Sequence, residues 1–539
     1  MASQLSEKQS TSSSDIRDDQ TIMKDDDSNP YNKIISKNVS EYHFIVPNNE
    51  LVEIGEIFSV RDEEKKITFL ARTTDIQHAS NYDGNWDTII RGNDFYDKDH
   101  IFNRVLAEPL GCIVQQEGEE RFRKSKTIPT KFSSVERSER KQFQFLIEVM
   151  GDIEVGTLRN GSKDVKDIPV ALHSDAMDHH MGVFATTGMG KSNFMKVFAA
   201  SCVKMASLGN SKFGLLIVDP HGEYLYGDGR EKGLLHIDTY RKGLVCYSTD
   251  PSRSKENSDV ADLRIMKKEI EPEDTYILYD WRPAQKEVLG AIPHIFDDNT
   301  WIDDVQTSDG RNRLNERKFQ NSTIDVVQRR MEEICRYRYI DDSGTSIANI
   351  VSHLKDGKVV LVDIPNLSER SELFLLSVLS RHILESYRKD VSSKKKRNRC
   401  LITIEEAQRV LGGGEGNLAR FESIAREGRK FGVGLCAITQ QPKLVDKQLL
   451  SQFNTFVILG LADRNDRNRL EESAKQDLHS LDVEIQTLEK GEAIISTLNI
   501  PFPIPTRIHH YKDYLTELNG QKLDYGDLEE LDDSIDPEW

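Results

Sequence analysis

The stretch between residues 180 and 194 constrains the fold of this chain more than any other part of its sequence. An apolar run ends in the string ATTGMGKS (185–192), and a segment with helical apolar spacing, NFMKVFAASCVKMAS, follows it. Glycine at 188 and 190 lets the backbone approach a bound group without Cβ clashes, while N–H groups of the turn and of the next helix converge on an anion. The string therefore predicts a phosphate-binding loop between a strand and a helix, with alanine at the first position where glycine is commoner.

The side chains of this loop indicate which phosphates it holds. The Lys191 ammonium group is suited to the β- and γ-phosphates of a nucleotide, and the Ser192 hydroxyl to Mg²⁺. We therefore expect ATP and Mg²⁺ as cofactors. The residues predicted to contact the nucleotide are Thr186, Thr187, Gly188, Met189, Gly190, Lys191, Ser192 and Asn193.

Short apolar runs recur after this loop and alternate with helical segments. They are FGLLIVDP, KVVLVDIP, RCLITIEE, GVGLCAITQQ and TFVILGLA. Continuous apolar runs are typical of parallel strands covered on both faces, so we predict an α/β core over residues 166–254 and 356–515. Residues 255–355, between these two parts, lack such runs and are interpreted as a helical insertion.

The chain before this core has a different texture. Residues 39–165 contain short alternating runs separated by Asn-Asn, Gly and Asp-Glu-Glu breaks, which predict a small β-barrel. Residues 1–38 are rich in Ser, Asp, Gln and Lys and are expected to be a disordered acidic tail. Residues 516–539 are expected to form a second acidic tail.

An acidic pair follows one of the apolar runs. Leu401–Ile404 is succeeded by Glu405 and Glu406. Hydrolysis of ATP needs a carboxylate on the metal side and a group that activates water. We expect Glu405 to hold Mg²⁺ through water and Glu406 to be the general base, with a solvated acidic strand end as the alternative.

Three further polar residues flank the next apolar run. Arg426 and Arg429 precede it, and Gln440 follows it. The arginines are either helix-end charges favoured by the helix dipole or a trans-acting pair that reaches the γ-phosphate of a neighbouring subunit. Gln440 is either a turn residue or an amide that senses the γ-phosphate.

Composition limits the remaining classes of function. The net charge is −18, with acidic residues concentrated at both ends, so DNA binding would require positive charge gathered locally in a groove or a ring. The six cysteines form no CxxC pair and are interpreted as reduced cytosolic thiols. No apolar run approaches the roughly 20 residues of a membrane span, and no apolar signal segment opens the sequence, so we expect a cytoplasmic protein.

Four strings together resemble a known family. FATTGMGKSNFMK, IVDPHGEY, IEEAQRVL and IAREGRKFGVGLCAITQQPKLVDKQLLSQFNTFVILGLADRND look like the HerA group of the HerA/FtsK ATPases, and VEIGEIFSV is similar to the HAS barrel that precedes their core. The resemblance implies a RecA-like P-loop core, a homo-hexameric ring and ATP-driven pumping of double-stranded DNA through a central channel. In archaea it also implies work beside a NurA nuclease in DNA end resection and double-strand-break repair.

The resemblance assigns roles by position to several residues already singled out. Lys191 and Glu406 match the family's phosphate lysine and catalytic glutamate, and Gln440 matches its sensor amide. Arg429, and less closely Arg426, matches the trans-acting arginine. ATP is therefore expected to be hydrolysed where two subunits meet.

The metal side of the site departs slightly from the family pattern. Ser192 matches the Mg²⁺ hydroxyl, but Glu405 stands where Asp is commoner, and Gln408 where His is commoner. A carboxylate is still present for the metal, so we expect hydrolysis to be retained. Asp219 and Glu223 match the acids after the second strand; Asp219 is a candidate metal ligand, with helix capping or loop ordering as the alternative.

Two other functions are compatible with parts of this sequence. Some HerA-like rings are assembly platforms for a nuclease or an NAD-cleaving effector in antiviral defence, with nucleotide binding mainly structural. The complete set of catalytic residues favours a motor over such a platform. A secretion-type pump is disfavoured because no membrane segment is present.

Overall fold

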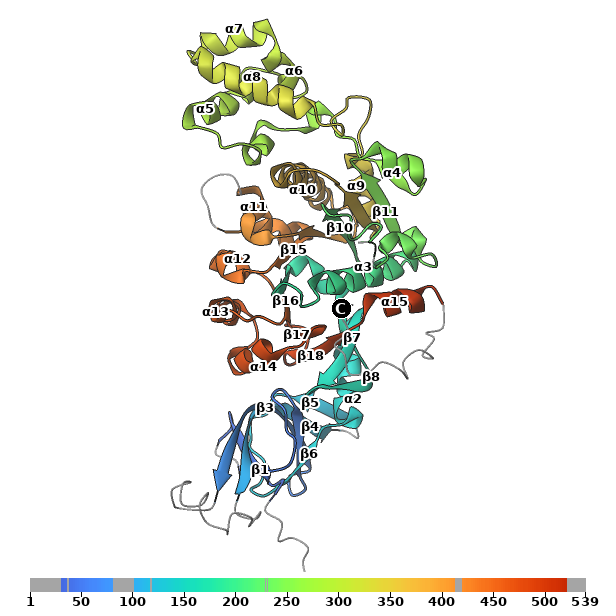
Figure 1. Ribbon diagram of the computed structural model, residues 1–539, viewed down its shortest axis with the longest axis vertical. Coiled ribbons are helices and arrows are strands. Elements are labelled where there is room, and N and C mark those ends of the chain that lie inside the picture. The colour runs from blue at the N-terminus through green and yellow to red at the C-terminus, as the bar shows by residue number, and fades with distance from the viewer. Residues whose placement is uncertain are drawn as a thin grey trace, which may run out of the picture.

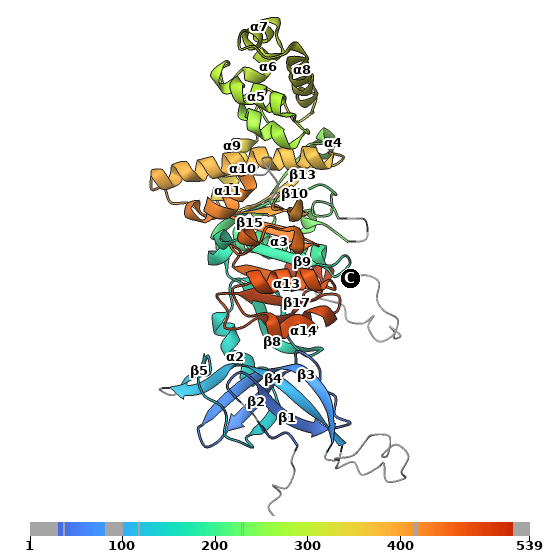
Figure 2. The ribbon, with the colours of Figure 1, turned by 90° about the vertical axis from the view of Figure 1, so that its left-hand side faces the viewer.

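The computed structural model describes residues 31–35, 38–80, 101–116, 119–227, 229, 231–412 and 419–520 (Figure 1). These residues form an elongated molecule with three parts along its longest axis. A β-barrel lies at one end, a large sheet with helices on both faces fills the middle, and a group of helices lies at the other end (Figures 1 and 2). None of the described helices is both long and apolar enough to cross a bilayer.

The barrel is an antiparallel sheet in the order β1-β4-β3-β2-β6, with β5 paired to β4. Its strands are β1 (Tyr42–Pro47), β2 (Ile57–Asp62), β3 (Ile67–Ser80), β4 (Ile101–Gln116), β5 (Glu119–Arg123) and β6 (Ser134–Arg137). Residues 32–35 form the seam between the two outer strands, because Ile34 pairs with Phe44 of β1 and Lys33 pairs with Ser134 of β6. The predicted barrel is therefore confirmed.

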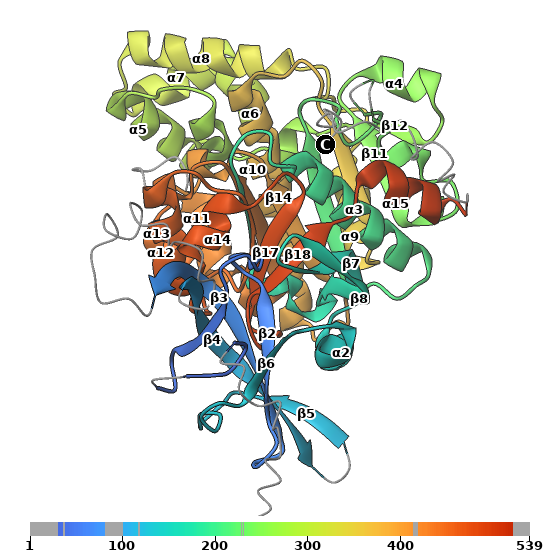
Figure 3. The same ribbon diagram turned by 60° about the horizontal axis from the view of Figure 1, so that its bottom comes forward.

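A 12-stranded sheet in the order β12-β11-β13-β10-β14-β15-β9-β16-β17-β18-β7-β8 forms the middle of the molecule. Neighbouring strands are parallel from β12 to β16 and antiparallel from β16 to β8. Figure 3 shows β17, β18, β7 and β8 following one another at the antiparallel end. The strands are β7 (Ile153–Asn160), β8 (Lys163–Leu172), β9 (Met181–Ala185), β10 (Phe213–Asp219), β11 (Leu244–Ser248), β12 (Val260–Asp262), β13 (Val359–Asp363), β14 (Arg399–Ile404), β15 (Val433–Thr439), β16 (Thr455–Leu459), β17 (Glu492–Thr497) and β18 (Ile504–Ile508).

Strands in the parallel part are buried on both faces. In β10, Leu215 and Ile217 face one apolar core while Leu216 and Val218 face the other. The first core is covered by α3 (Lys191–Ser207) and α15 (Tyr511–Leu518), and the second by α9 (Ile347–Lys355), α10 (Glu369–Ser392) and α11 (Ala419–Glu427). Two-sided burial explains the continuous apolar runs and confirms the predicted α/β P-loop core.

Four helices form the unit at the far end of the molecule (Figure 2). They are α5 (Pro283–Ala291), α6 (Trp301–Gln306), α7 (Ser308–Glu316) and α8 (Asn321–Cys335). Their apolar sides pack together around residues such as Val305, Val327 and Met331. The other α-helices of the described residues are α2 (Arg140–Val149), α4 (Pro251–Glu256), α12 (Lys447–Leu450), α13 (Arg464–Ser473) and α14 (Asp482–Thr487).

The structure divides the chain differently from the sequence-based boundaries. Strands β7 and β8 belong to the large sheet, so the barrel ends with β6, well before the predicted boundary at residue 165. Strand β12 and helix α9 also belong to the core, although the sequence predicts a helical insertion over residues 255–355. The alternating pattern of β7 resembles that of a barrel strand. Such a pattern predicts a strand but does not reveal which sheet the strand joins.

The two predicted tails overlap the folded part of the chain at their inner ends. Residues 32–35 complete the barrel, and α15 continues to Leu518. Residues 1–30 and 521–539 lie outside the described residues.

A polar junction fixes the barrel to the large sheet. The turn between β7 and β8 meets a barrel loop, where the Ser162 N–H donates to Glu53 Oε2 at 2.6 Å. Beside this turn, the buried Glu484 carboxylate of α14 lies 3.0 Å from the Arg159 guanidinium of β7 and 3.9 Å from that of Arg72 in β3. Buried charges from both sheets therefore depend on one another.

Candidate active site

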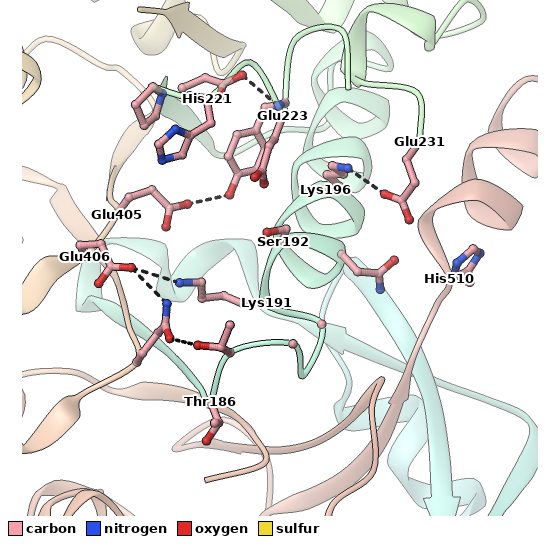
Figure 4. A pocket seen from close by; sticks show the side chains of 18 of the residues that line it. Thr186, Lys191, Ser192, Lys196, His221, Glu223, Glu231, Glu405, Glu406 and His510 are labelled. Atoms are coloured by element: carbon pink, nitrogen blue, oxygen red, sulfur yellow. Dashed lines mark hydrogen bonds and ion pairs between the residues drawn. The ribbon is translucent and has the colours of Figure 1, made fainter. Parts of the chain in front are cut away.

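A cavity of about 920 Å³ opens at the C-terminal ends of β9, β10, β14 and β15 (Figure 4). This edge of a parallel sheet is where ligands usually bind. The cavity brings together most of the predicted phosphate loop and both predicted carboxylates. Its lining residues are Thr186, Thr187, Gly188, Gly190, Lys191, Ser192, Asn193, Lys196, Asp219, Pro220, His221, Glu223, Tyr224, Glu231, Glu405, Glu406, Gln440, His510 and Lys512.

The phosphate loop has the predicted strand–turn–helix arrangement. Strand β9 leads into the turn, and α3 begins at Lys191. The turn uses φ angles of 86° at Gly188 and 96° at Gly190, a region that residues with a Cβ rarely adopt. The Thr186 N–H donates to the Gly460 carbonyl at 3.0 Å, which fixes the start of the turn next to the end of β16.

Two predicted nucleotide contacts use their side chains elsewhere. Met189 does not line the cavity, and its side chain lies against Gly460. The Asn193 side chain donates to the His509 carbonyl at 2.9 Å and accepts from the Tyr511 N–H at 2.8 Å. Asn193 therefore anchors the segment after β18 to the phosphate-loop helix.

Glu405 and Glu406 reach the same cavity through an unusual backbone turn. Glu405 directly follows β14 and accepts a hydrogen bond from the Tyr224 hydroxyl at 2.7 Å, and burial raises its pKa. Glu406 has φ 47° and ψ 47°, a left-handed conformation that costs a non-glycine residue about 1–2 kcal/mol. Because of this turn, two carboxylates that are adjacent in sequence both line the cavity.

The Glu406 carboxylate is held by one ion pair and two hydrogen bonds. Oε1 lies 3.7 Å from the Lys191 ammonium group and 3.3 Å from Gln440 Nε2, while Oε2 accepts from Gln408 Nε2 at 2.7 Å. Burial alone would raise the pKa of Glu406, but the Gln408 hydrogen bond and the Lys191 charge together hold it below its usual value. Glu406 is therefore ionised at neutral pH, as a general base must be.

Gln440 lies between the phosphate loop and Glu406. Strand β15, which it follows, is placed between β9 and β14 in the sheet. Its Oε1 accepts from the Thr187 hydroxyl, and its Nε2 donates to Glu406 (Figure 4). The amide thus contacts both sides of the cavity where a γ-phosphate would lie.

Asp219 lines the cavity, but its carboxylate accepts hydrogen bonds from the loop that follows β10. Its buried carboxylate accepts backbone hydrogen bonds from Tyr224 at 2.9 Å, Leu225 at 3.0 Å and His221 at 3.3 Å. Burial raises the pKa of Asp219, against the effect of these N–H groups. These contacts match the alternative role of loop ordering, and metal binding by Asp219 stays a prediction.

The structure does not bring Arg426 and Arg429 to the cavity of their own chain. Both side chains are exposed, in α11 and in the turn before β15. The arginines precede the N-terminal end of β15, and Gln440 follows its C-terminal end. The seven residues of β15 span roughly 20 Å at the usual rise of a strand. The arginines therefore lie at the opposite edge of the sheet.

Sequence reasoning missed several residues that line the cavity far from the carboxylates. Buried Lys196 of α3 forms an ion pair with Glu231 at 2.7 Å (Figure 4). His510 and Lys512 come from the segment after β18. Lys196 is an ordinary lysine within a helix, and His510 and Lys512 lie some 300 residues after the phosphate loop. No local sequence pattern therefore indicates that they line the same cavity. Only the fold brings them to the phosphate loop.

A second cavity shares Glu405 and Glu406 with the first and contains another perturbed acid. Burial, together with the negative charge of Glu405, raises the pKa of Glu372 to about 7 despite the nearby Arg409. Asp363 ends strand β13, which lies next to β10 in the sheet, and burial raises its pKa to about 6. The pKa values of the acidic groups around the strand ends thus differ widely, from the lowered pKa of Glu406 to the raised pKa of Glu372.

Fold and site together define a P-loop ATPase with a RecA-like core. The family model described as "Helicase HerA, central domain" matches residues 153–383. The chain is 30% identical over 368 residues to the DNA double-strand break repair helicase HerA of Saccharolobus solfataricus, covering 67% of this chain and 70% of that protein. It is 26% identical over 403 residues to the DNA double-strand break repair helicase HerA of Pyrococcus furiosus, and this match covers 67% of this chain and 70% of that protein.

The chain therefore belongs to the HerA helicase family and is an ATP-hydrolysing enzyme, which confirms the predicted resemblance. Among solved structures, it is similar to the unbound bacterial conjugative coupling protein TrwB, with a TM-score of 0.45 and 14% identity. That similarity covers 69% of this chain and 92% of the TrwB chain in that structure, a form named TrwBdeltaN70.

Proposed function

We propose that this chain is an ATP-driven translocase for double-stranded DNA that works as a homo-hexameric ring. The observation that carries the proposal is the separation of the predicted catalytic residues between opposite edges of one sheet. Lys191, Glu406 and Gln440 lie at one edge, and Arg426 and Arg429 are exposed at the other. A head-to-tail ring brings the second edge of each subunit to the first edge of the next.

The chemistry proposed for this seam uses one role for each group. Ser192 and the Glu405 oxygen not bonded to Tyr224 offer the oxygen ligands that Mg²⁺ prefers, Glu405 through water. Bound Mg²⁺ would neutralise charge on the phosphates.

The remaining groups act on the γ-phosphate and the attacking water. Lys191 binds the β- and γ-phosphates, and Glu406 accepts a proton from the attacking water. Gln440 senses the γ-phosphate, and Arg429 of the next subunit, with Arg426 beside it, stabilises the charge that develops in the transition state.

Double-stranded DNA is the substrate that the relatives favour, since four of them are named as DNA double-strand break repair helicases. A single subunit with net charge −18 would repel DNA overall. Six copies around a channel multiply a few inward-facing basic side chains, so the ring also accounts for DNA binding by an acidic chain. We expect a NurA-type nuclease as partner, in DNA end resection in the cytoplasm.

Native mass measurement followed by ATP turnover tests this function. We expect a particle of six chains, stabilised by nucleotide, whose ATP turnover rises when linear duplex DNA is added. A Lys191→Ala protein should lack turnover with and without DNA. An assembly platform would form the ring and bind ATP without moving along DNA, and wild-type turnover that ignores DNA would argue against a translocase.

A further inference from the structure

Gln408 contacts the predicted general base from outside the cavity. It lies two residues after Glu406, in the short turn Ala407–Arg409, and donates from Nε2 to Glu406 Oε2 at 2.7 Å. Its Oε1 accepts from the Thr439 hydroxyl at 2.6 Å, and that hydroxyl accepts from the Gln441 N–H at 3.0 Å. Gln408 thus links the base to the buried end of β15.

The chemistry of these groups fixes which atom donates and which accepts in each of these hydrogen bonds. An ionised carboxylate can only accept, so the nitrogen of the Gln408 amide must face Glu406 and its oxygen must face Thr439. The Thr439 hydroxyl then donates to Gln408 while it accepts from the backbone. Thr439 is fully buried, so this anchor is rigid.

The other contacts of Glu406 are ones that a nucleotide would disturb. Lys191 and Gln440 share Oε1, both line the cavity, and Gln440 also accepts from Thr187 of the phosphate loop. Bound phosphates compete for the lysine ammonium group and for the sensor amide. Gln408 does not line the cavity, so its hydrogen bond is not exposed to that competition.

We propose that Gln408 is a positioning residue that keeps Glu406 directed at the attacking water once nucleotide has engaged Lys191 and Gln440. This inference rests on the proposed hydrolytic role of Glu406. The left-handed backbone fixes where the Glu406 side chain starts, and the Gln408 amide fixes where its carboxylate ends. Thr439 keeps that amide from rotating.

The test compares basal ATP turnover, without DNA, among single variants of the full chain. Gln408→Leu removes both hydrogen bonds at similar volume, and Gln408→His keeps one donor and one acceptor on the ring. Thr439→Val removes the anchor, and Gln441→Leu is the matched control, because the exposed Gln441 side chain makes no hydrogen bond with the described residues.

We expect Gln408→Leu to lower kcat roughly 100-fold, the scale of a misplaced catalytic group, with KM and the Kd of a non-hydrolysable ATP analogue within about twofold of wild type. Gln408→His should turn over at least about tenfold faster than Gln408→Leu. Thr439→Val should also lower kcat, and the double variant Gln408→Leu/Thr439→Val should be no slower than Gln408→Leu alone, because both residues act through one contact. Gln441→Leu should match wild type.

Three results would overturn the inference. They are a Gln408→Leu enzyme with wild-type kcat, a loss of analogue affinity as large as the loss of kcat, and a Gln408→His enzyme no faster than Gln408→Leu. Thr439→Ser keeps the hydroxyl and should retain kcat, which separates the hydrogen bond from packing in the buried strand. Failure of DNA to stimulate the wild-type enzyme would count against the translocase while leaving this comparison of basal rates intact.

Discussion

The Lys191 ammonium group lies 3.7 Å from Oε1 of Glu406, so the predicted phosphate lysine and the predicted general base form an ion pair across the cavity. Incoming phosphates must break this pair to recruit the lysine. We therefore expect nucleotide binding to release Glu406 from this ion pair.

Replacing Lys191 by alanine should therefore affect binding first. We expect the affinity for ATP to fall at least about 100-fold, because a charge-assisted contact to two phosphates is lost in a partly buried site. Titration with a fluorescent ATP analogue measures this loss. Lys204→Ala, in the last turn of the same helix, is the control and should bind as wild type; equal affinities for all three proteins would contradict the assignment of the phosphate loop.

Glu406→Gln should separate binding from chemistry. The amide keeps the volume of the side chain but cannot accept the proton of water, so we expect kcat to fall about 10²–10⁴-fold with ATP affinity retained. Single-turnover hydrolysis together with equilibrium binding measures both quantities. A Glu406→Gln protein that still hydrolyses ATP at the wild-type rate would show that another group is the base.

The arginine pair predicts complementation between inactive subunits. Arg429→Ala supplies a complete cavity, and Lys191→Ala supplies a complete arginine edge. Random mixing of the two proteins in a head-to-tail ring should restore about a quarter of the sites, because half the cavities are intact and half of those meet an intact arginine. ATP turnover of the mixture against each protein alone measures this, and a mixture as inactive as its components would place the arginine's role elsewhere.

Glu372 predicts a pH-dependent effect on stability. The folded state raises its pKa to about 7 by burial and by the charge of Glu405, so the folded protein holds a proton there that the unfolded chain releases above its ordinary pKa of 4.5. The stability linked to this proton is present below that ordinary value and is lost as the pH rises through about 7.

Glu372→Gln should accordingly raise Tm by roughly 1–3 °C relative to wild type at pH 8, with little difference at pH 5. Calorimetry at the two pH values measures the change. Glu369→Gln, at the start of the same helix, has an exposed carboxyl and should show no such pH dependence. A Glu372→Gln effect of the same size at both pH values would mean that the carboxyl is ionised throughout.

The junction between barrel and core predicts a large penalty for removing one buried charge. Glu484→Gln leaves the buried Arg72 guanidinium without its carboxylate and leaves buried Arg159 with Glu492 alone, which should cost about 3–5 kcal/mol. Thermal unfolding should show a transition lowered by several degrees. Glu63→Gln, which breaks an exposed pair with Arg61, is the control and should cost at most about 1 kcal/mol.

Local sequence was sufficient for those parts of the site that are contiguous in the chain. The phosphate loop and the Glu405–Glu406 pair each combine an apolar strand with the polar residues that directly follow it, so their place at one edge of a parallel sheet could be predicted. The same logic placed Gln440 near them, because β15 is one more strand of that sheet.

The residues that were missed or misplaced depend on contacts between distant segments. Lys196 and Lys512 meet in the cavity only because the segment after β18 returns to α3, held there by Asn193. The membership of β7 in the large sheet depends on its pairing with β18, some 350 residues later. The sequence marks Gln408 only as a departure from the family pattern, because its partner Thr439 lies on another strand.

The seam formed by residues 32–35 bears on how the protein can be shortened for study. A chain trimmed to begin at residue 39, where alternating strands first become visible, would lack the residues that pair with β1 and β6. Two strand edges with open N–H and C=O groups would then face solvent, and such edges invite strand pairing between molecules. A truncated protein should therefore begin before Asn32, so that the residues of the seam are kept.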